Sequence, residues 1–145
     1  MRIAVKMAFG DRPVRYIPRP GVYAIITNTD GHLAVVEVKT KYFLIGGGLD
    51  INESDQDGLR REMMEETGRG ILSSEFVGRV NQYVDSYDGH FNKIGSFYKV
   101  KLTQGNSIEH DPTHVFRWVT REEFQARGAH EAQIYAVENF INEND

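Results

Sequence analysis

Three glutamates in one short stretch are the residues of this chain best suited to chemistry. The stretch, residues 61–68, reads REMMEETG. Because each residue of an α-helix advances by roughly 100°, Glu62, Glu65 and Glu66 would fall within one arc of about 100°. An apolar residue, Met63, lies beside that arc and gives the helix a face to bury. A helix over this stretch would therefore carry three carboxylates in one stripe near its C-terminal end.

The stripe has two interpretations, a solvated helix face or a metal site. Glu62 and Glu66 are four residues apart, and like charges at this spacing destabilise a helix by about 0.2–0.5 kcal/mol. The negative end of the helix dipole adds to that cost. A divalent cation would relieve the repulsion, because Mg²⁺ and Mn²⁺ prefer carboxylate oxygens and bind through a few acids together with substrate phosphates.

The residues upstream of the stripe favour the metal site. Gly47, five residues, Glu53, seven residues and then REMMEETG at 61–68 resemble the Nudix box, G-x5-E-x7-R-E-U-x-E-E-x-G-U, in which U is a bulky aliphatic residue. Seven fixed positions match, and with frequencies of about 7% or less at each, coincidence at a given site is on the order of one in 10⁸. The chain departs from the pattern at Arg69, which replaces an aliphatic residue, and at Ile45, which replaces a frequent proline. Neither departure removes an acid.

The resemblance implies a set of metal ligands. Glu62, Glu65 and Glu66 would bind the cation, and the carbonyl of Gly46 would supply a further oxygen. The implied cofactor is Mg²⁺, with Mn²⁺ as a substitute.

The resemblance also implies a reaction and roles for the neighbouring residues. Members of the Nudix family hydrolyse a nucleoside diphosphate linked to another moiety, by attack of a metal-activated water on phosphorus. A carboxylate near that water takes its proton, and Glu62 is our first choice for this general base. Arg61 would orient a glutamate of the box, and Glu53 would brace Arg61 or help to hold the water.

Residues outside the box could complete the site. Many Nudix enzymes recruit another acid from a loop, although an acid in a turn is more often simply solvated. The acids in turn-like segments are Asp85, Asp88, Glu109 and Asp111. An aromatic side chain could stack on a base, although strand alternation would send only some of the candidates to one pocket. These candidates are Tyr83, Tyr87, Phe91, Phe97 and Tyr98.

The hydrophobic pattern predicts the elements that must position these residues. Strands are expected at 21–28, 33–38, 42–45, 71–85, 91–102 and 115–119, and helices at 54–67, from 121 and at 131–141. Ser54 is a good N-cap, Gly68 stands where a helix would stop, and residues 12–20, with three prolines, should form an extended lead-in. This order predicts an α+β or α/β fold. The resemblance, which covers most of 19–123, implies an α+β fold, an α/β/α sandwich with a mixed sheet flanked by helices, and a single domain over 1–145.

The composition bounds the class of protein and its partners. The chain has 145 residues, of which 40% are hydrophobic and 26% charged, as in an ordinary soluble domain. Its net charge of −4 gives no overall attraction for a nucleic-acid polymer. The absence of cysteine excludes disulfides and thiolate chemistry, and no apolar run approaches the roughly 20 residues of a membrane span. We expect a cytoplasmic protein with a small-molecule nucleotide as its partner; monomer and homodimer both stay open.

Two functions are compatible with the sequence. The first is a Mg²⁺-dependent Nudix pyrophosphohydrolase acting on a nucleoside triphosphate, a dinucleoside polyphosphate or a similar compound. The second is a catalytically silent Nudix-fold module that binds a nucleotide or regulates another protein. Because the box keeps every acid, the sequence favours the hydrolase.

Overall fold

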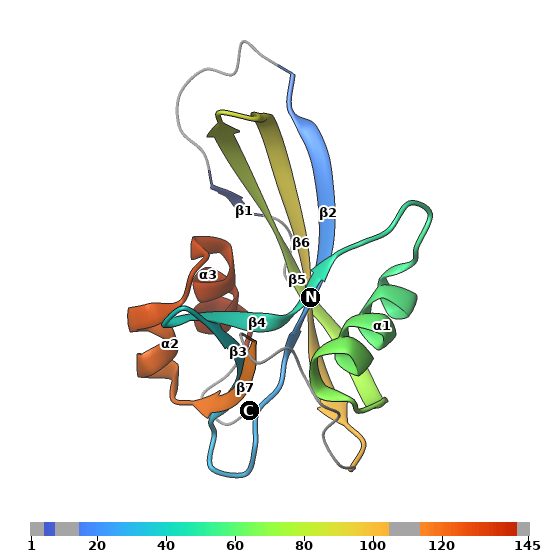
Figure 1. Ribbon diagram of the computed structural model, residues 1–145, viewed down its shortest axis with the longest axis vertical. Helices are drawn as coiled ribbons and strands as arrows, with labels where there is room; N and C mark the ends of the chain where they lie inside the picture. The colour runs from blue at the N-terminus through green and yellow to red at the C-terminus, as the bar shows by residue number, and fades with distance from the viewer. Residues whose placement is uncertain (1–4, 8–14, 105–113, 142–145) are drawn as a thin grey trace.

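A mixed β-sheet with helices on both sides organises the chain (Figure 1). The structure is a computed structural model that describes residues 5–7, 15–104 and 114–141. Its strands are β1 (Val5–Met7), β2 (Ile17–Ile25), β3 (Leu33–Val38), β4 (Lys41–Gly48), β5 (Ile71–Ser86), β6 (Gly89–Leu102) and β7 (Val115–Val119). Its helices are α1 (Asp55–Thr67), α2 (Arg121–Arg127) and α3 (Glu131–Phe140).

The strands of this described part form one seven-stranded sheet in the order β1-β5-β6-β2-β4-β3-β7. The pairs β1–β5 and β2–β6 are parallel, and the other neighbouring pairs are antiparallel. The predicted α+β class, with a mixed sheet flanked by helices, is confirmed.

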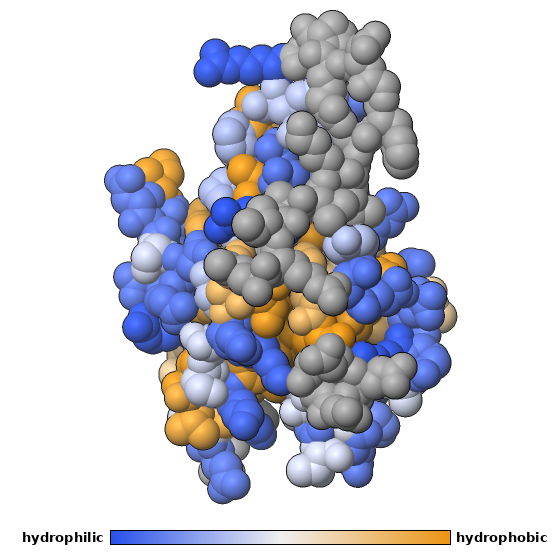
Figure 2. Space-filling model, turned by 180° about the vertical axis from the view of Figure 1, so that it is seen from behind, coloured by the Kyte–Doolittle hydropathy of each residue, from blue (hydrophilic) through white to orange (hydrophobic). Residues whose placement is uncertain are grey.

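Helix α1 lies on one face of the sheet, and α2 and α3 lie on the other (Figure 1). Each face has its own hydrophobic cluster. Leu59 of α1 packs with Val22 and Ile45 on the first face, and Val137 of α3 packs with Phe97 on the second. Seen from behind, hydrophobic residues gather near the middle of the molecule and hydrophilic residues surround them (Figure 2). Among the helices of the described residues, none is long and apolar enough to cross a membrane.

Strand β2 begins earlier than the sequence predicted. Its first four residues, from Ile17, were expected in a lead-in because they include Pro18 and Pro20, yet they pair with β6 from Phe91 onward. The prolines are tolerated because β4 pairs with β2 only from Gly21 onward, so no β4 strand partner needs their missing N–H groups. The carbonyl of Pro20 faces this side and accepts a hydrogen bond from the Leu49 N–H at 3.0 Å.

Strands β5 and β6 form a long hairpin, which extends past the helices together with β2 (Figure 1). The hairpin turns between Ser86 and Gly89, where the sequence predicted a turn, and Gly89 has a φ of 141° that suits glycine. In the middle of β5, a Cβ on Gly78 would stand 2.6 Å from the ring of Phe140, so glycine lets α3 pack against the sheet. The hairpin and β2 thereby provide an open floor beside α3.

Candidate active site

Helix α1 is held at both ends and along its buried face. Ser54 caps the start, with its Oγ accepting a hydrogen bond from the Asp57 N–H at 3.2 Å. The helix ends at Gly68, whose φ of 70° is left-handed. Leu59 and Met63 are fully buried against the sheet. These anchors direct the glutamate stripe toward the glycine-rich end of β4.

The glycines of β4 bring the backbone close to two of the glutamates. The N–H of Gly46 donates a hydrogen bond of 2.8 Å to Oε1 of Glu66. A Cβ on Gly47 would stand 2.6 Å from Oε1 of Glu62, so only glycine leaves room for this carboxylate. Glu65 lies at the outer edge, with 57% of its side chain exposed, against 11% for Glu62. The stripe therefore runs from a buried acid to a solvated one.

Arg61 links the loop before α1 to the stripe. Its Nη2 and Nε donate to the two carboxylate oxygens of Glu53 at 2.8 and 2.9 Å, and its Nη2 also donates to the carbonyl of Gly48 at 3.0 Å. Its Nη1 donates to Oε1 of Glu62 at 3.0 Å and reaches Glu65 at 3.4 Å. The hydrogen bonds from Arg61 lower the pKa of Glu53 to about 2. One guanidinium thus fixes three of the acids that the sequence singled out.

Burial and repulsion make the inner carboxylates hard to ionise. Burial is the main cause that raises the pKa of Glu66 to about 8; the Gly46 N–H opposes it, and the charge of Glu62 adds to it. Burial likewise raises the pKa of Glu62, against the hydrogen bond from Arg61. Two partly buried acids that repel each other are a favourable environment for a cation.

The donor set fits a hard divalent cation. The side-chain donors are all carboxylate oxygens, and they hold more negative charge than Arg61 neutralises. In the described part of the chain no three acidic or imidazole side chains converge on one point. Here Glu62 and Glu65 face Arg61 instead, and Glu66 faces Gly46.

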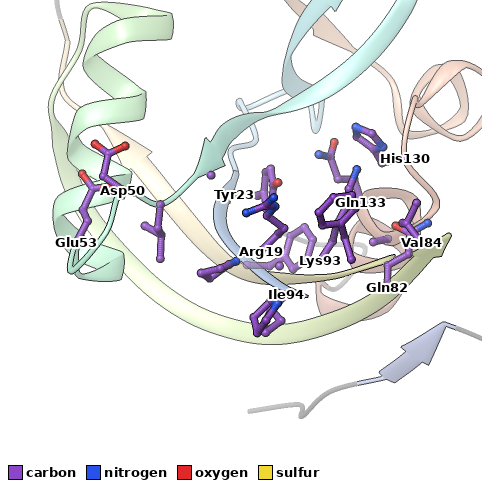
Figure 3. Close-up of a pocket in the computed structure, with 18 of the residues that line it drawn as sticks. Arg19, Tyr23, Asp50, Glu53, Gln82, Val84, Lys93, Ile94, His130 and Gln133 are labelled. Atoms are coloured by element: carbon purple, nitrogen blue, oxygen red, sulfur yellow. The ribbon is translucent and has the colours of Figure 1, made fainter. Parts of the chain in front are cut away.

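A cavity of about 780 Å³ lies beside the loop that precedes α1 (Figure 3). Glu53 of the box lines it, whereas the three glutamates of the stripe do not. The walls of the cavity are the loop between β4 and α1, with Asp50 and Glu53, and the beginning of α3, with His130. Its floor is formed by β2, β5 and β6. Pockets of this size accommodate drug-sized ligands.

Tyr23 of β2 is a residue of this site that the sequence did not single out. It lines the cavity, and its ring stacks on Phe97 with the centroids 5.4 Å apart. Burial, and then the charges of Glu62 and Glu66, raise the pKa of its hydroxyl. The β2–β4 register, which pairs Tyr23 with Gly46, brings it to the acids. Strand alternation in the sequence could have predicted which face of the sheet Tyr23 lies on, but it could not have predicted that Tyr23 lies near Glu62 and Glu66.

Only some of the aromatic candidates for base stacking lie on the side of the strands that lines the cavity. Phe91 and Phe97 line the cavity. Tyr98 points away and donates a hydrogen bond of 2.6 Å to Oδ2 of Asp55, and Tyr87 is fully exposed. Tyr83 contacts the ring of Tyr16 instead of lining the cavity. Phe97 is fully buried in the core. Among the five, the structure therefore leaves Phe91 as the candidate for base stacking.

Of the four acids proposed outside the box, the two that the structure describes do not join the stripe. Asp85 accepts a hydrogen bond from the hydroxyl of Tyr16 at 2.8 Å and lies 2.7 Å from Nδ1 of His90. Asp88 is an exposed residue of the hairpin turn. Glu109 and Asp111 lie outside the described residues.

Comparisons with known proteins bear on the family and the fold. Residues 17–140 match the sequence model of the NUDIX domain. The chain belongs to the Nudix family. This match covers every box residue, so the predicted family is confirmed. A search of curated proteins returned no significant match.

Several solved structures share the Nudix fold of this chain. The ORF135 protein of E. coli is 23% identical, with a TM-score of 0.69, and the alignment covers 86% of this chain and 89% of that one. A MutT NUDIX hydrolase from Burkholderia pseudomallei is 22% identical, with a TM-score of 0.70 and coverage of 86% and 98%. The MutT protein of Bacillus halodurans is 16% identical, with a TM-score of 0.69 and coverage of 83% and 80%.

Proposed function

We propose that this Nudix protein is a Mg²⁺-dependent pyrophosphohydrolase that cleaves a nucleoside diphosphate linked to another moiety. The main support is that a cavity of about 780 Å³ is lined by Glu53, which Arg61 connects by hydrogen bonds to Glu62 of the glutamate stripe. Tyr23 lies between the cavity and the stripe. It lines the cavity, and the charges of Glu62 and Glu66 help to raise the pKa of its hydroxyl. Family membership and the likeness to a protein described as a MutT NUDIX hydrolase support the same reaction.

Glu62, Glu65 and Glu66, with the carbonyl of Gly46, would hold the cation. When bound, Mg²⁺ or Mn²⁺ neutralises phosphate charge and lowers the pKa of a water molecule. Arg61 holds the acid beside it in place through its 3.0 Å hydrogen bond to Glu62.

Glu62 is the proposed general base. It is nearly enclosed, with 11% of its side chain exposed, and it lies among the residues that would hold the cation, so its carboxylate is placed to take a proton from a water molecule there. The oxygen of the water forms a new bond to one phosphorus, while the bond from that phosphorus to the bridging oxygen breaks. The bridging oxygen leaves with the electron pair, and the proton of the water passes to the carboxylate. Arg61 and Glu53 position the base through their paired hydrogen bonds.

We further propose that the reaction uses small-molecule nucleotides in the cytoplasm, as a monomer or a homodimer, without a nucleic-acid polymer or a membrane as partner. The net charge of −4 supports this choice of partners. Sedimentation of the purified protein distinguishes monomer from dimer.

A substrate panel with Mg²⁺ tests the proposed function. The panel contains canonical and oxidised nucleoside triphosphates, dinucleoside polyphosphates, ADP-ribose and nucleotide sugars, and the readout is release of phosphate, pyrophosphate or nucleoside monophosphate. We expect release from at least one class. Measurable binding without release from any compound would instead identify the silent nucleotide-binding module.

A further inference from the structure

Two cationic side chains from neighbouring strands point into the cavity away from the acids. Arg19 of β2 and Lys93 of β6 are Cα partners in the parallel β2–β6 pair, and both line the cavity. In Figure 3 they lie on the floor between the acids of the loop before α1 and His130 of α3. The cavity is therefore acidic at one wall and basic on its floor.

Within the described part of the chain, neither cation is paired with a carboxylate. Among the described residues, no acid lies within 4.0 Å of Arg19 or Lys93. The guanidinium of Arg19 lies over the ring of Phe91, with 4.6 Å between its central carbon and the ring centroid. This stacking orients the guanidinium and leaves its N–H edge free to bind an oxyanion in a bidentate manner.

The start of α3 adds to the positive potential of the same region. His130 is the N-cap of this ten-residue helix and lines the cavity together with Ala132. Its side chain makes no capping hydrogen bond, and burial and then the charge of Lys93 lower its pKa. The first N–H groups of α3 carry the positive end of the helix dipole.

We propose that Arg19, Lys93 and the start of α3 form an anion subsite that binds a phosphate of the substrate beyond the scissile pyrophosphate. This inference rests on the proposed function, because it takes the glutamate stripe as the place of cleavage. A chain of three or more phosphates would extend from the stripe to the two cations. The subsite therefore favours nucleoside triphosphates and dinucleoside polyphosphates over nucleotide sugars with a neutral sugar.

Binding of inorganic tripolyphosphate to the metal-free protein tests the subsite without hydrolysis. Titration calorimetry in EDTA should show binding that weakens with added salt. Arg19→Gln and Lys93→Gln should each raise the Kd by about tenfold, because each removes a charged hydrogen-bond donor. Lys101→Gln is the matched control, since Lys101 is an exposed residue of the same strand and does not line the cavity. Its Kd should equal that of the wild type.

A kinetic measurement with Mg²⁺ identifies the phosphate. Arg19→Gln and Lys93→Gln should raise the KM for a nucleoside triphosphate by about tenfold and leave the KM for a nucleotide sugar with a neutral sugar unchanged. If the KM for a dinucleoside tetraphosphate rises equally, the subsite binds an internal phosphate. If only the KM for the triphosphate rises, the subsite binds a terminal phosphate. Arg19→Lys should raise the KM less than Arg19→Gln does, because lysine keeps the positive charge but lacks the paired N–H donors of the guanidinium.

The two proposals fail separately. Hydrolysis of phosphate-rich substrates with unchanged KM and Kd in both variants would overturn the subsite and leave the proposed function intact. Binding of tripolyphosphate that depends on both cations, without hydrolysis of any compound, would support the subsite and overturn the function. Absence of tripolyphosphate binding to the wild type would also overturn the subsite. Melting temperatures check folding, and if Arg19→Gln fails to fold, Lys93→Gln decides alone.

Discussion

Glu62 and Glu65 show how strongly environment separates residues of one type on one helix. Both belong to the stripe and both contact Arg61, yet Glu62 is nearly enclosed and Glu65 is mostly solvated. Enclosure raises the pKa of Glu62, because desolvation penalises the charged form. The buried acid is therefore the better candidate for a proton acceptor, and the exposed acid is suited only to completing a ligand set.

Glu62→Gln separates catalysis from folding. The substitution keeps the volume and removes one of the repelling charges, so the melting temperature of the metal-free protein should stay the same or rise slightly. At saturating Mg²⁺, kcat should fall by orders of magnitude, because a charged ligand and the base are both lost. Glu138→Gln, an exposed position of α3, is the control and should retain full kcat. If Glu62→Gln kept more than about a tenth of kcat, a loss under about 1.4 kcal/mol of barrier, Glu62 would not be a principal catalytic residue.

The stability of the metal-free protein should depend on pH through Glu66. Its pKa is about 8 in the folded chain against an ordinary value of 4.5, so between these values the folded state binds more protons than the unfolded state. The free energy of unfolding should then fall as pH rises through this window, by at most about 1.4 kcal/mol for each pH unit. The pKa of Glu53 is lowered to about 2, so its stabilising effect is lost only as pH falls below 4.5.

Denaturant unfolding in EDTA across this pH range measures the effect of Glu66. In Glu66→Gln, the free energy of unfolding should vary less with pH. At the alkaline end of the range, this variant should be more stable than the wild type. An unchanged slope in the variant would show that the carboxyl titrates normally.

At the scale of elements, the end of β4 and the helix α1 form one unit. The backbone of Gly47 approaches the carboxylate of Glu62 more closely than a residue with a Cβ would allow, and a Cβ on Gly46 would clash with Val22 and Tyr23 of β2. Pairing with β2 holds that backbone in place, with Val22 opposite Gly47. The glycines are therefore required for the position of the acids as well as for the path of the chain.

Gly47→Ala tests this close approach. Its Cβ would stand 2.6 Å from Oε1 of Glu62, so the carboxylate must move while the fold persists. We expect kcat to fall by about tenfold or more, because small displacements of a catalytic group are costly, and the melting temperature to change much less. Gly70→Ala is the matched control, since its Cβ would meet nothing closer than 3.6 Å. Wild-type turnover in Gly47→Ala would contradict the inferred packing.

At the scale of the whole molecule, the proposed active region is built from elements that are far apart in the sequence. The stripe belongs to α1, the floor to β2, β5 and β6, and the far wall to α3. A substrate that bridges the stripe and the cavity would contact all of these elements, so ligand binding should stabilise the fold as a whole.

Removal of metal tests this coupling. EDTA should abolish activity, and Mg²⁺ or Mn²⁺ should restore it, because the proposed ligands are all oxygens. Mg²⁺ should also raise the melting temperature of the wild type and raise it less in Glu66→Gln, since the variant has lost a charged ligand. Full activity in a metal-stripped sample would refute the mechanism.

The sequence by itself determined the local structure and the family. The N-cap at Ser54 and the stop at Gly68 predicted the bounds of α1 almost to the residue, and the hairpin turn before Gly89 was also predicted. These features depend on neighbours in the chain, such as the Ser54 side chain and the Asp57 N–H. The spacing of the Nudix box also depends on neighbours in the chain, because its acids lie on one continuous loop and helix. The sequence alone could therefore identify the family.

Only the tertiary structure decided what surrounds the acids. The β2–β4 register places Tyr23 beside the stripe, and the β2–β6 register sets Arg19 next to Lys93. The early start of β2 depends on the absence of a β4 partner at Pro18 and Pro20. Each of these results joins residues more than twenty positions apart. Their registers are fixed by burying apolar faces of the whole sheet against helices, and no local pattern in the chain contains that information.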